Sequence, residues 1–310
     1  MRFFRSSRSG ATNAPTPSPA RSAEVSDLVE NYGHVVVDEC HHLSAVTFED
    51  ISRAAKAKYV LGLSATVTRK DGHRPIIFMQ CGPIRYRVDA KKQAASRPFS
   101  HRVIVRPTAF RSPFPEIDTT RSIQHLYDLL AHDDGRNDMI FDDVLSALEA
   151  GRSPVVITER KDHLRVIAER LMKFAKNIVV LKGGMTAKQR DQTMKALAAI
   201  PDAEERVIVA TGRYLGEGFD DARLDTFFLT MPISWRGTLA QYAGRLHRLH
   251  AAKREVVIYD YVDRNDPMLT KMAAKRRAGY AALGYTMTEL GDLFAFEPKI
   301  PKPSIPAAPE

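Results

Sequence analysis

Short runs of consecutive apolar residues, each followed by a polar loop that contains glycine, constrain this chain more than any other feature. Two such runs, residues 207–210 and Thr226–Leu229, lie in its second half. They are too short for helices and do not alternate with polar residues, which predicts parallel strands buried on both faces. Ligands of open α/β sheets bind outside the carboxyl ends of the strands. The loop at residues 211–220 is therefore predicted to lie where a nucleotide or a phosphate chain binds.

A helix that carries two arginines follows these strands. We expect this helix at residues 238–246. Gln241, Arg245 and Arg248 are spaced by four and three residues, which places them on one helix face. Two guanidinium groups on one face suit a polyphosphate.

The alternation of apolar strands and helices extends over most of the chain and predicts an α/β fold with doubly wound parallel sheets. The predicted strands are residues 35–37, 59–63, 155–158, 178–181, 207–210, 226–229 and 256–261, with short strands near 76–79 and 84–88. The predicted helices are residues 48–57, 123–130, 139–150, 163–174, 187–197 and 238–246.

The distribution of apolar residues predicts two domains between loose ends. We interpret residues 91–115, which hold several prolines and basic residues around the apolar run 103–105, as part of the interdomain connection. The predicted segments are a disordered leader at 1–27, a first domain at 28–108, a connection at 109–136, a second domain at 137–290 and a disordered proline-rich tail at 291–310.

The charge of the chain is positive and uneven. Its 310 residues carry a formal net charge of +9, and residues 236–277 hold ten Lys and Arg against four Asp and Glu. Such a patch suits a polyanion, although a solvated basic face has the same composition. The sequence shows no membrane span, no hydrophobic signal core and no cysteine framework, so we expect a cytoplasmic setting without a membrane partner.

Several motifs in series resemble those of superfamily 2 helicases and translocases. QYAGRLHR at residues 241–248 matches the Q-x-x-G-R-x-x-R pattern of motif VI, and EGFDDARLD at 217–225 contains the G-x-D of motif V. VVVDECHH at 35–42 resembles the D-E-x-H form of motif II, and SAT at 64–66 resembles motif III. The remaining similarities, to motif IV and the segment after it, are residues 155–171 and 181–190.

The motif wording is nearest to the restriction-subunit (Res) and repair-helicase lineage. The resemblance implies RecA-like doubly wound sheets, with a truncated first domain and a complete second, helicase C-terminal domain. It also implies that the chain works on nucleic acid, which we interpret as DNA, with RNA left open.

ATP and Mg²⁺ are the cofactors that the resemblance implies. Asp38 and Glu39 follow a predicted strand, where carboxylates can hold a hydrated magnesium ion on nucleotide phosphates. Glu39 would polarise the attacking water, and Arg245 and Arg248 would be arginine fingers that reach across a cleft to the transferred phosphoryl group. The implied ATP-binding residues are Asp38, which holds Mg²⁺ via water, and His41, Gly218, Asp220 and Gln241.

The nucleic-acid contacts implied by the resemblance come from residues at the ends of strands. They would bind backbone phosphates rather than bases. These residues are Ser64, Thr66, Thr158, Arg160, Gly183 and Thr211.

The family's first motif, a phosphate loop of the form G-x-x-x-x-G-K-[ST], is missing. The sequence contains no Gly-Lys dipeptide, and only 37 residues precede Asp38. We therefore expect an N-terminally truncated first domain, either because the chain is a fragment or divergent product of a longer gene or because another polypeptide supplies the missing half.

Three functions follow, in order of preference. The first is the carboxyl-terminal part of an ATP-dependent DNA helicase or translocase, inactive as an isolated chain because it lacks the phosphate loop. The second is a catalytically inactive nucleic-acid-binding or regulatory protein that keeps the fold. The third is a metal-dependent hydrolase that uses His41, His42 and the neighbouring acids and binds zinc.

Overall fold

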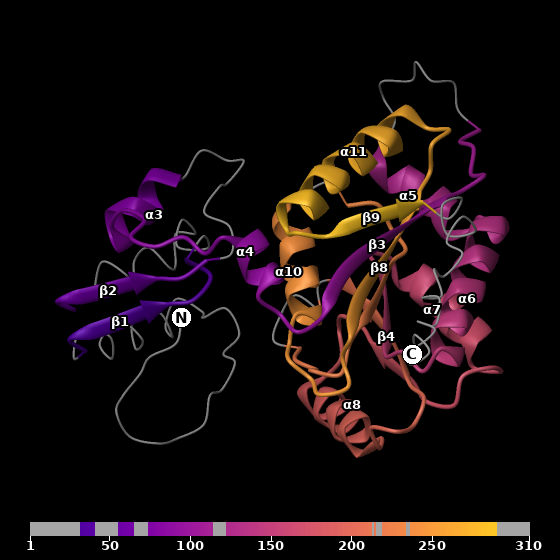
Figure 1. Ribbon diagram of the computed structural model, residues 1–310, viewed down its shortest axis with the longest axis horizontal. Coiled ribbons are helices and arrows are strands. Elements are labelled where there is room, and N and C mark those ends of the chain that lie inside the picture. Colours follow the sequence, from indigo (N-terminus) through magenta and orange to yellow (C-terminus); the bar gives the residue numbers. More distant parts are fainter. Residues whose placement is uncertain are drawn as a thin grey trace, which may run out of the picture. The chain divides into compact units, whose positions relative to one another are not determined.

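The computed structural model of the chain describes residues 32–40, 55–64, 74–113, 122–212, 214, 219–233 and 236–289. The chain divides into two compact units, residues 1–88 and 89–310. Their helices and strands are labelled in Figure 1.

The first unit contains a pair of parallel strands, as the sequence predicts. Strand β1 (His34–Val37) pairs with β2 (Tyr59–Gly62), and helix α3 (Arg74–Cys81) follows. The short strand predicted near residues 76–79 is wrong, because these residues lie within α3. Their burial has a helical period: Ile77 packs against Val35 and Val37, and Cys81 lies one turn further on. Residues 84–88 form no strand either.

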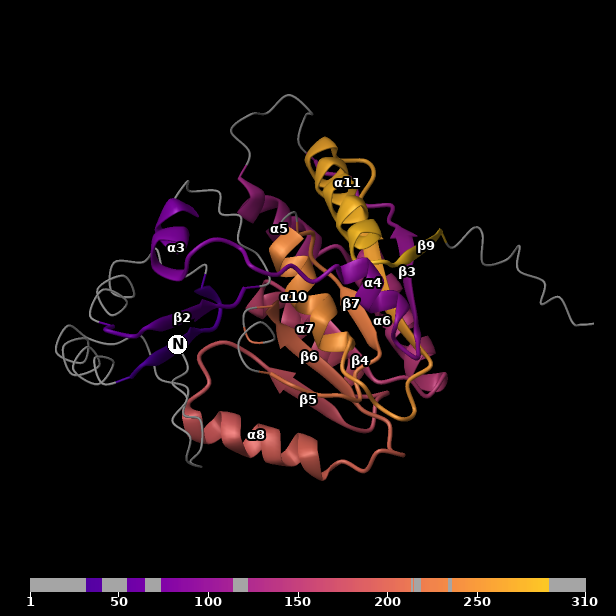
Figure 2. The ribbon, with the colours of Figure 1, turned by 60° about the vertical axis from the view of Figure 1, so that its left-hand side comes forward.

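The second unit is built on a sheet of seven parallel strands in the order β5-β6-β4-β7-β8-β3-β9. Figure 2 shows β5, β6, β4 and β7 side by side, with α8 beside β5. The five strands predicted in the second half, which are β4 to β8, are confirmed within a residue or two, whereas β3 and β9 were not predicted as strands. The strands are β3 (Ser100–Pro107), β4 (Pro154–Thr158), β5 (Ile178–Leu181), β6 (Val207–Thr211), β7 (Thr226–Leu229), β8 (Glu255–Val262) and β9 (Thr286–Glu289).

Strand β3 corrects the interpretation of residues 91–115 as a connection. It pairs with β8 over eight residues and with β9 on its other side. The side chain of Val103 is fully buried in the core of the sheet. The prolines around this run are typical of a linker, but pairing with a strand about 150 residues later decides its structure.

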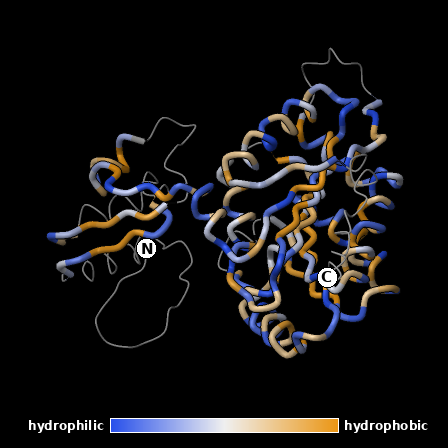
Figure 3. Tube along the Cα trace, viewed as in Figure 1, coloured by the Kyte–Doolittle hydropathy of each residue, from blue (hydrophilic) through white to orange (hydrophobic). Residues whose placement is uncertain are grey.

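Helices cover both faces of the sheet, which is the doubly wound arrangement (Figure 1). One core packs α8, α10 and α11 against the sheet, and the other packs α6 and α7 against the opposite face. The central strands are the most hydrophobic part of the trace of this unit in Figure 3. The helices are α4 (Ala90–Ala95), α5 (Ile123–Ala131), α6 (Asp134–Glu149), α7 (Lys161–Leu171), α8 (Ala187–Ala199), α10 (Arg236–Leu246) and α11 (Pro267–Ala282).

None of the helices in the described part of the chain combines the length and the apolar content that a membrane span needs.

Candidate functional site

The carboxyl ends of β4, β5 and β6 bring together three residues that were predicted to contact nucleic acid. Thr158 and Thr211 are register partners in the β4–β6 ladder. The backbone N–H of Gly183, in the loop after β5, donates a 3.3 Å hydrogen bond to Oγ1 of Thr211. Loops that start 53 residues apart in sequence, after Thr158 and Thr211, therefore meet at one edge of the sheet.

Thr158 is completely buried, and its hydroxyl serves an internal network. It lies 3.0 Å from Nδ1 of His163, whose Nε2 lies 2.8 Å from Oδ1 of Asn137. Burial lowers the pKa of His163 to about 3, so the ring is neutral. Its Nε2–H donates to the amide oxygen of Asn137, and Nδ1 accepts from the threonine hydroxyl. That hydroxyl also accepts from the backbone N–H of Arg160 at 3.2 Å, which fixes the loop carrying Arg160.

Arg160 is held by two carboxylates. Its Nε and one terminal nitrogen donate to the two carboxylate oxygens of Asp162 at 3.1 and 3.0 Å. The same terminal nitrogen forms an ion pair with Asp128 of α5. The hydrogen bonds from Arg160 lower the pKa of Asp162 to about 2. Asp128 was not selected from the sequence, because nothing in its neighbourhood indicates contact with a loop 32 residues later.

Three segments meet around Gly212, at the end of β6. The phenol of Tyr242, on α10, donates a 3.0 Å hydrogen bond to Oε1 of Glu159, directly after β4. A Cβ atom on Gly212 would overlap both the phenol oxygen and the carboxylate. Burial, followed by the charge of Glu159, raises the pKa of Tyr242. Neither Glu159 nor Tyr242 was predicted from the sequence, although they are direct neighbours of Thr158 and Gln241.

Helix α10 ends at Leu246, so Arg248 lies in the turn beyond it and not on the helix. The expectation that Gln241, Arg245 and Arg248 share one helix face is therefore met only by Gln241 and Arg245. The structure instead brings Arg248 to Asp220, with Nε 2.9 Å from Oδ1 and both side chains about half exposed. These two residues belong to the segments that resemble motifs VI and V.

In the first unit, Asp38 and Glu39 follow β1. Glu39 has a φ of +52°, a left-handed conformation that is uncommon for a residue other than glycine, and its N–H donates to Oδ1 of Asp38 at 3.1 Å. Main-chain hydrogen bonds of 2.8 Å, from Leu63 N–H to Val37 O and from Cys40 N–H to Leu63 O, tie the segments before Ser64 and around Asp38 together. Strained backbone of this kind is typical of functional sites.

Three of the selected residues, His41, Thr66 and Gly218, lie outside the described residues. The Sγ atoms of Cys81 and Cys40 lie 2.8 and 3.1 Å from the position that a Cβ on Gly62 would take, so both thiols pack against this glycine.

Comparison with known proteins places these segments in a family. The profile of the type III restriction enzyme res subunit matches residues 11–69, and that of the helicase conserved C-terminal domain matches residues 137–250. These two matches, together with the helicase relatives below, support a superfamily 2 helicase of the Res/DEAD-like lineage. The second profile spans the residues of β4 to β7 and of α10, and thus the whole edge described above.

Individual curated proteins are also similar to this chain in sequence. A probable helicase of Escherichia phage T5 is 25% identical over 269 residues, which are 84% of this chain and 56% of the relative. A transcript termination protein of fowlpox virus is 27% identical over 159 residues, 50% of this chain and 34% of the relative. The chain spans about half the length of the first curated relatives that it matches.

Among solved structures, Dbp5 of S. cerevisiae bound to RNA and ADP BeF3 superposes with a TM-score of 0.53 at 14% identity, over 84% of this chain and 61% of that one. This likeness establishes the RecA-like α/β fold, which confirms the fold class predicted from the sequence.

Proposed function

We propose that this chain is the carboxyl-terminal part of an ATP-dependent DNA helicase or translocase, in which ATP hydrolysis drives strand movement or unwinding. The observation that carries the proposal is the convergence of Thr158, Gly183 and Thr211 at the carboxyl edge of β4, β5 and β6, where α/β sheets bind phosphate groups. Arg160, held beside this edge, supplies the cation for a backbone phosphate.

The choice of DNA rests on the res-subunit profile, which is named for a restriction enzyme. The likeness to an RNA-bound structure makes RNA the alternative partner. In either case, contacts to phosphates bind all sequences alike and weaken as the salt concentration rises.

The residues proposed to act on ATP belong to the segments that resemble motifs II, V and VI. Asp38 is exposed at the end of β1, and a carboxylate in this place fits a hydrated Mg²⁺ ion. Mg²⁺ would neutralise charge on the nucleotide phosphates. Glu39 would polarise the attacking water, and Arg245 and Arg248 would stabilise charge on the transferred phosphoryl group. The residues proposed to contact the nucleotide itself are His41, Gly218, Asp220 and Gln241.

Turnover would also need a phosphate loop from outside these 310 residues, because the sequence contains no Gly-Lys dipeptide. Strand β2 supports this part of the proposal. Tyr59, Val60 and Leu61 are each exposed by 36% or more, whereas strands of a complete parallel sheet are covered on both faces. A polypeptide segment that carries the loop and its strand, from the same protein or a separate one, would complete this unit.

A second candidate is a nucleic-acid-binding or regulatory protein without turnover. The missing phosphate loop favours it, since the loop's amides and lysine provide much of the affinity for nucleotide. The two candidates predict the same binding of nucleic acid and differ in hydrolysis.

The deciding experiment measures nucleic-acid-stimulated ATP hydrolysis by the chain alone and after fusion to the phosphate-loop half of a related helicase. We expect negligible hydrolysis by the chain alone, hydrolysis by the fusion, and its loss in Glu39→Gln and Arg248→Ala. Fusions that bind DNA but never hydrolyse ATP would favour the regulatory candidate. Parallel titrations with single-stranded DNA and RNA of one sequence identify the partner.

A further inference from the structure

The turn that follows α10 is organised around a buried lysine. Lys253 is only 4% exposed, and its Nζ donates 2.8 Å hydrogen bonds to the carbonyl oxygens of Leu246 and Arg248. The backbone N–H of Lys253 donates to the carbonyl of His250 at 3.1 Å. The segment from Leu246 to Lys253 therefore folds around the ammonium group of Lys253.

A second cation binds the carbonyl oxygen of His247, which lies between Leu246 and Arg248 in the sequence. Arg97, from the segment between α4 and β3, donates to the carbonyl oxygen of His247. The carbonyls of three successive residues, Leu246, His247 and Arg248, thus point at Lys253 and Arg97. Carbonyls at the end of a helix lack partners within the helix and carry partial negative charge, so cationic donors are suited to this place.

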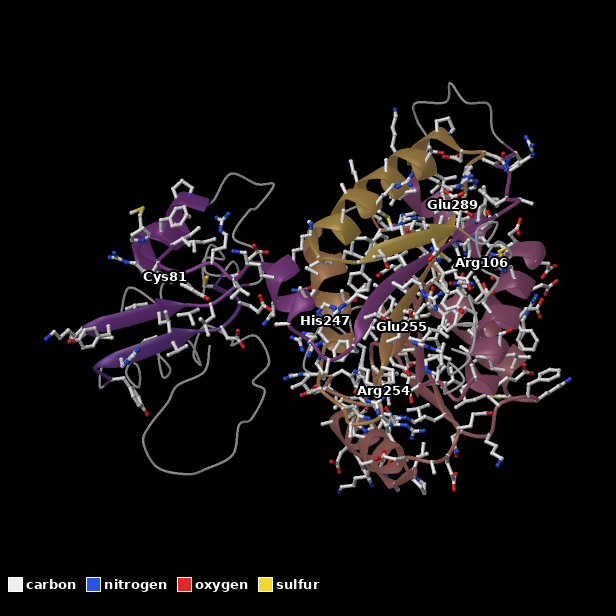
Figure 4. All side chains as sticks on the ribbon, in the orientation of Figure 1. Cys81, Arg106, His247, Arg254, Glu255 and Glu289 are labelled. Atoms are coloured by element: carbon white, nitrogen blue, oxygen red, sulfur yellow. The ribbon has the colours of Figure 1, made fainter. Side chains whose placement is uncertain are left out.

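The side chains of His247 and Arg248 differ in exposure and in their partners. The ring of His247, labelled in Figure 4, is half-buried, with Nε2 2.8 Å from the hydroxyl of Tyr285, and packs edge-to-face on the ring of His101 with 4.7 Å between the ring centroids. The next side chain, Arg248, is about half exposed and reaches Asp220. Fixing the backbone on the inside determines where the guanidinium of Arg248 emerges.

Holding an ammonium group here is costly, which argues against a role in packing alone. Burial lowers the pKa of Lys253 to about 8. Its neighbours include the ring of Phe99, with Nζ 5.5 Å from the ring centroid, and the guanidinium of Arg97. A methionine would fill the same volume without this desolvation, so a lysine is justified by the carbonyls that it holds.

We propose that Lys253 is the positioning residue for Arg248: by holding the carbonyls on both sides of His247, it sets the place from which Arg248 reaches phosphate. This inference rests on the proposed role of Arg248 in ATP hydrolysis. The structural part of the proposal, that Lys253 fixes the turn at residues 246–248, does not depend on that role.

The first test uses the 310-residue chain and needs no ATPase. In Lys253→Met, we expect the backbone amides of residues 247–250 to exchange hydrogen about tenfold faster, while those of β4 and β6 keep their rates. With ¹⁵N-labelled arginine, the Nε signal of Arg248, assigned by its loss in Arg248→Lys, should lose the shift caused by Asp220. Lys271→Met, an exposed lysine on α11, is the matched control and should change neither.

Unchanged exchange and an unchanged Arg248 signal in folded Lys253→Met would overturn the proposal. If Lys253→Met does not fold, Lys253→Gln, whose neutral amide is one bond shorter than the lysine, tests the same two carbonyl contacts: faster exchange at residues 247–250 supports the proposal, and wild-type exchange contradicts it.

The second test uses the fusion that hydrolyses ATP. Lys253→Met and Arg248→Ala should each lower kcat strongly, on the order of 10³-fold for the loss of an arginine finger. The double variant should be no slower than Arg248→Ala, because the lysine acts through the arginine. Multiplicative losses would show that Lys253 acts elsewhere. Normal kcat in Arg248→Ala would refute the proposed finger, and the exchange experiment would still decide whether Lys253 positions the turn.

Discussion

The phenol oxygen of Tyr242 lies 3.0 Å from Oε1 of Glu159, and this hydrogen bond passes directly over the Cα of Gly212. It links the loop after β4, the end of β6 and helix α10. Because Glu159 precedes Arg160 and α10 leads into the turn of Arg248, the contact connects the proposed nucleic-acid and nucleotide residues of the second unit.

Gly212→Ala should break this arrangement. The added methyl would overlap both partners of the hydrogen bond, so we expect a loss of about 1–3 kcal/mol in the free energy of unfolding, measured by chemical denaturation. Gly244→Ala is the matched control, because a Cβ there meets nothing within 4 Å and alanine favours helix α10, which should stabilise the chain by about 0.5–1 kcal/mol. Equal effects of the two substitutions would show that the space over Gly212 is not filled as described.

Asp128→Asn should strengthen binding of nucleic acid. The carboxylate of Asp128 competes with phosphate for Arg160, so its neutralisation should tighten binding of a single strand by roughly threefold to tenfold at low salt. Fluorescence anisotropy with labelled oligonucleotides measures this effect. Arg160→Ala should weaken all sequences alike and reduce the slope of log affinity against log salt by about one.

Glu149→Gln is the control for the change in net charge. Glu149 ends α6, before β4 begins, and thus lies toward the opposite edge of the sheet from Arg160. If it tightened binding as much as Asp128→Asn, the general charge of the chain, and not the ion pair with Arg160, would explain the result.

Asp260→Asn should destabilise the second unit strongly. Asp260 of β8 accepts hydrogen bonds of 2.9 and 3.1 Å from Nε of Arg276 on α11, and both side chains are buried. Removing one partner leaves an uncompensated buried charge, which costs about 3–5 kcal/mol. Glu289→Gln, which breaks the exposed pair of Arg264 and Glu289, should change the free energy of unfolding by no more than about 1 kcal/mol. Comparable losses in thermal and chemical unfolding of both variants would contradict the burial of the Asp260 pair.

The stability of the chain should fall in mild acid because of buried neutral histidines. The pKa of His163 is about 3 in the folded chain, against an ordinary value of 6.5, so between these pH values only the unfolded state binds the proton. The free energy of unfolding therefore decreases as pH falls from 6.5 toward 3. Burial lowers the pKa of His247 to about 3 as well, and it contributes in the same window.

In His163→Gln, the decrease in the free energy of unfolding between pH 6.5 and pH 4 should be shallower than in the unmodified chain. Denaturation at several pH values measures it, with stability at neutral pH recorded separately because the substitution also alters the hydrogen bonds to Thr158 and Asn137. The same slope in both chains would mean that His163 is protonated in the folded state.

The sequence by itself determined five of the seven strands of the second sheet, β4 to β8, and the edge at which the proposed site residues gather. A continuous apolar run such as residues 207–210 indicates that a strand is buried on both faces. Parallel strands are buried in this way, so the local sequence is enough to predict them. The resemblance to superfamily 2 helicases implied a shared role for Thr158, Gly183 and Thr211, and the carboxyl ends of parallel strands, which share one edge, bring them together.

Only the tertiary structure decided what these residues touch. Strand β3 has the local pattern of a linker, but it pairs with β8. Asp128 lies on what reads as a surface helix, but it forms an ion pair with Arg160. Residues 246–248 belong to a basic segment, but their carbonyls bind Lys253 and Arg97. Periodicity records whether a residue is buried, but the partner of a buried or half-buried charge depends on how separate segments pack. For that reason, the sequence indicated Arg248, and only the packed turn revealed the lysine that holds it.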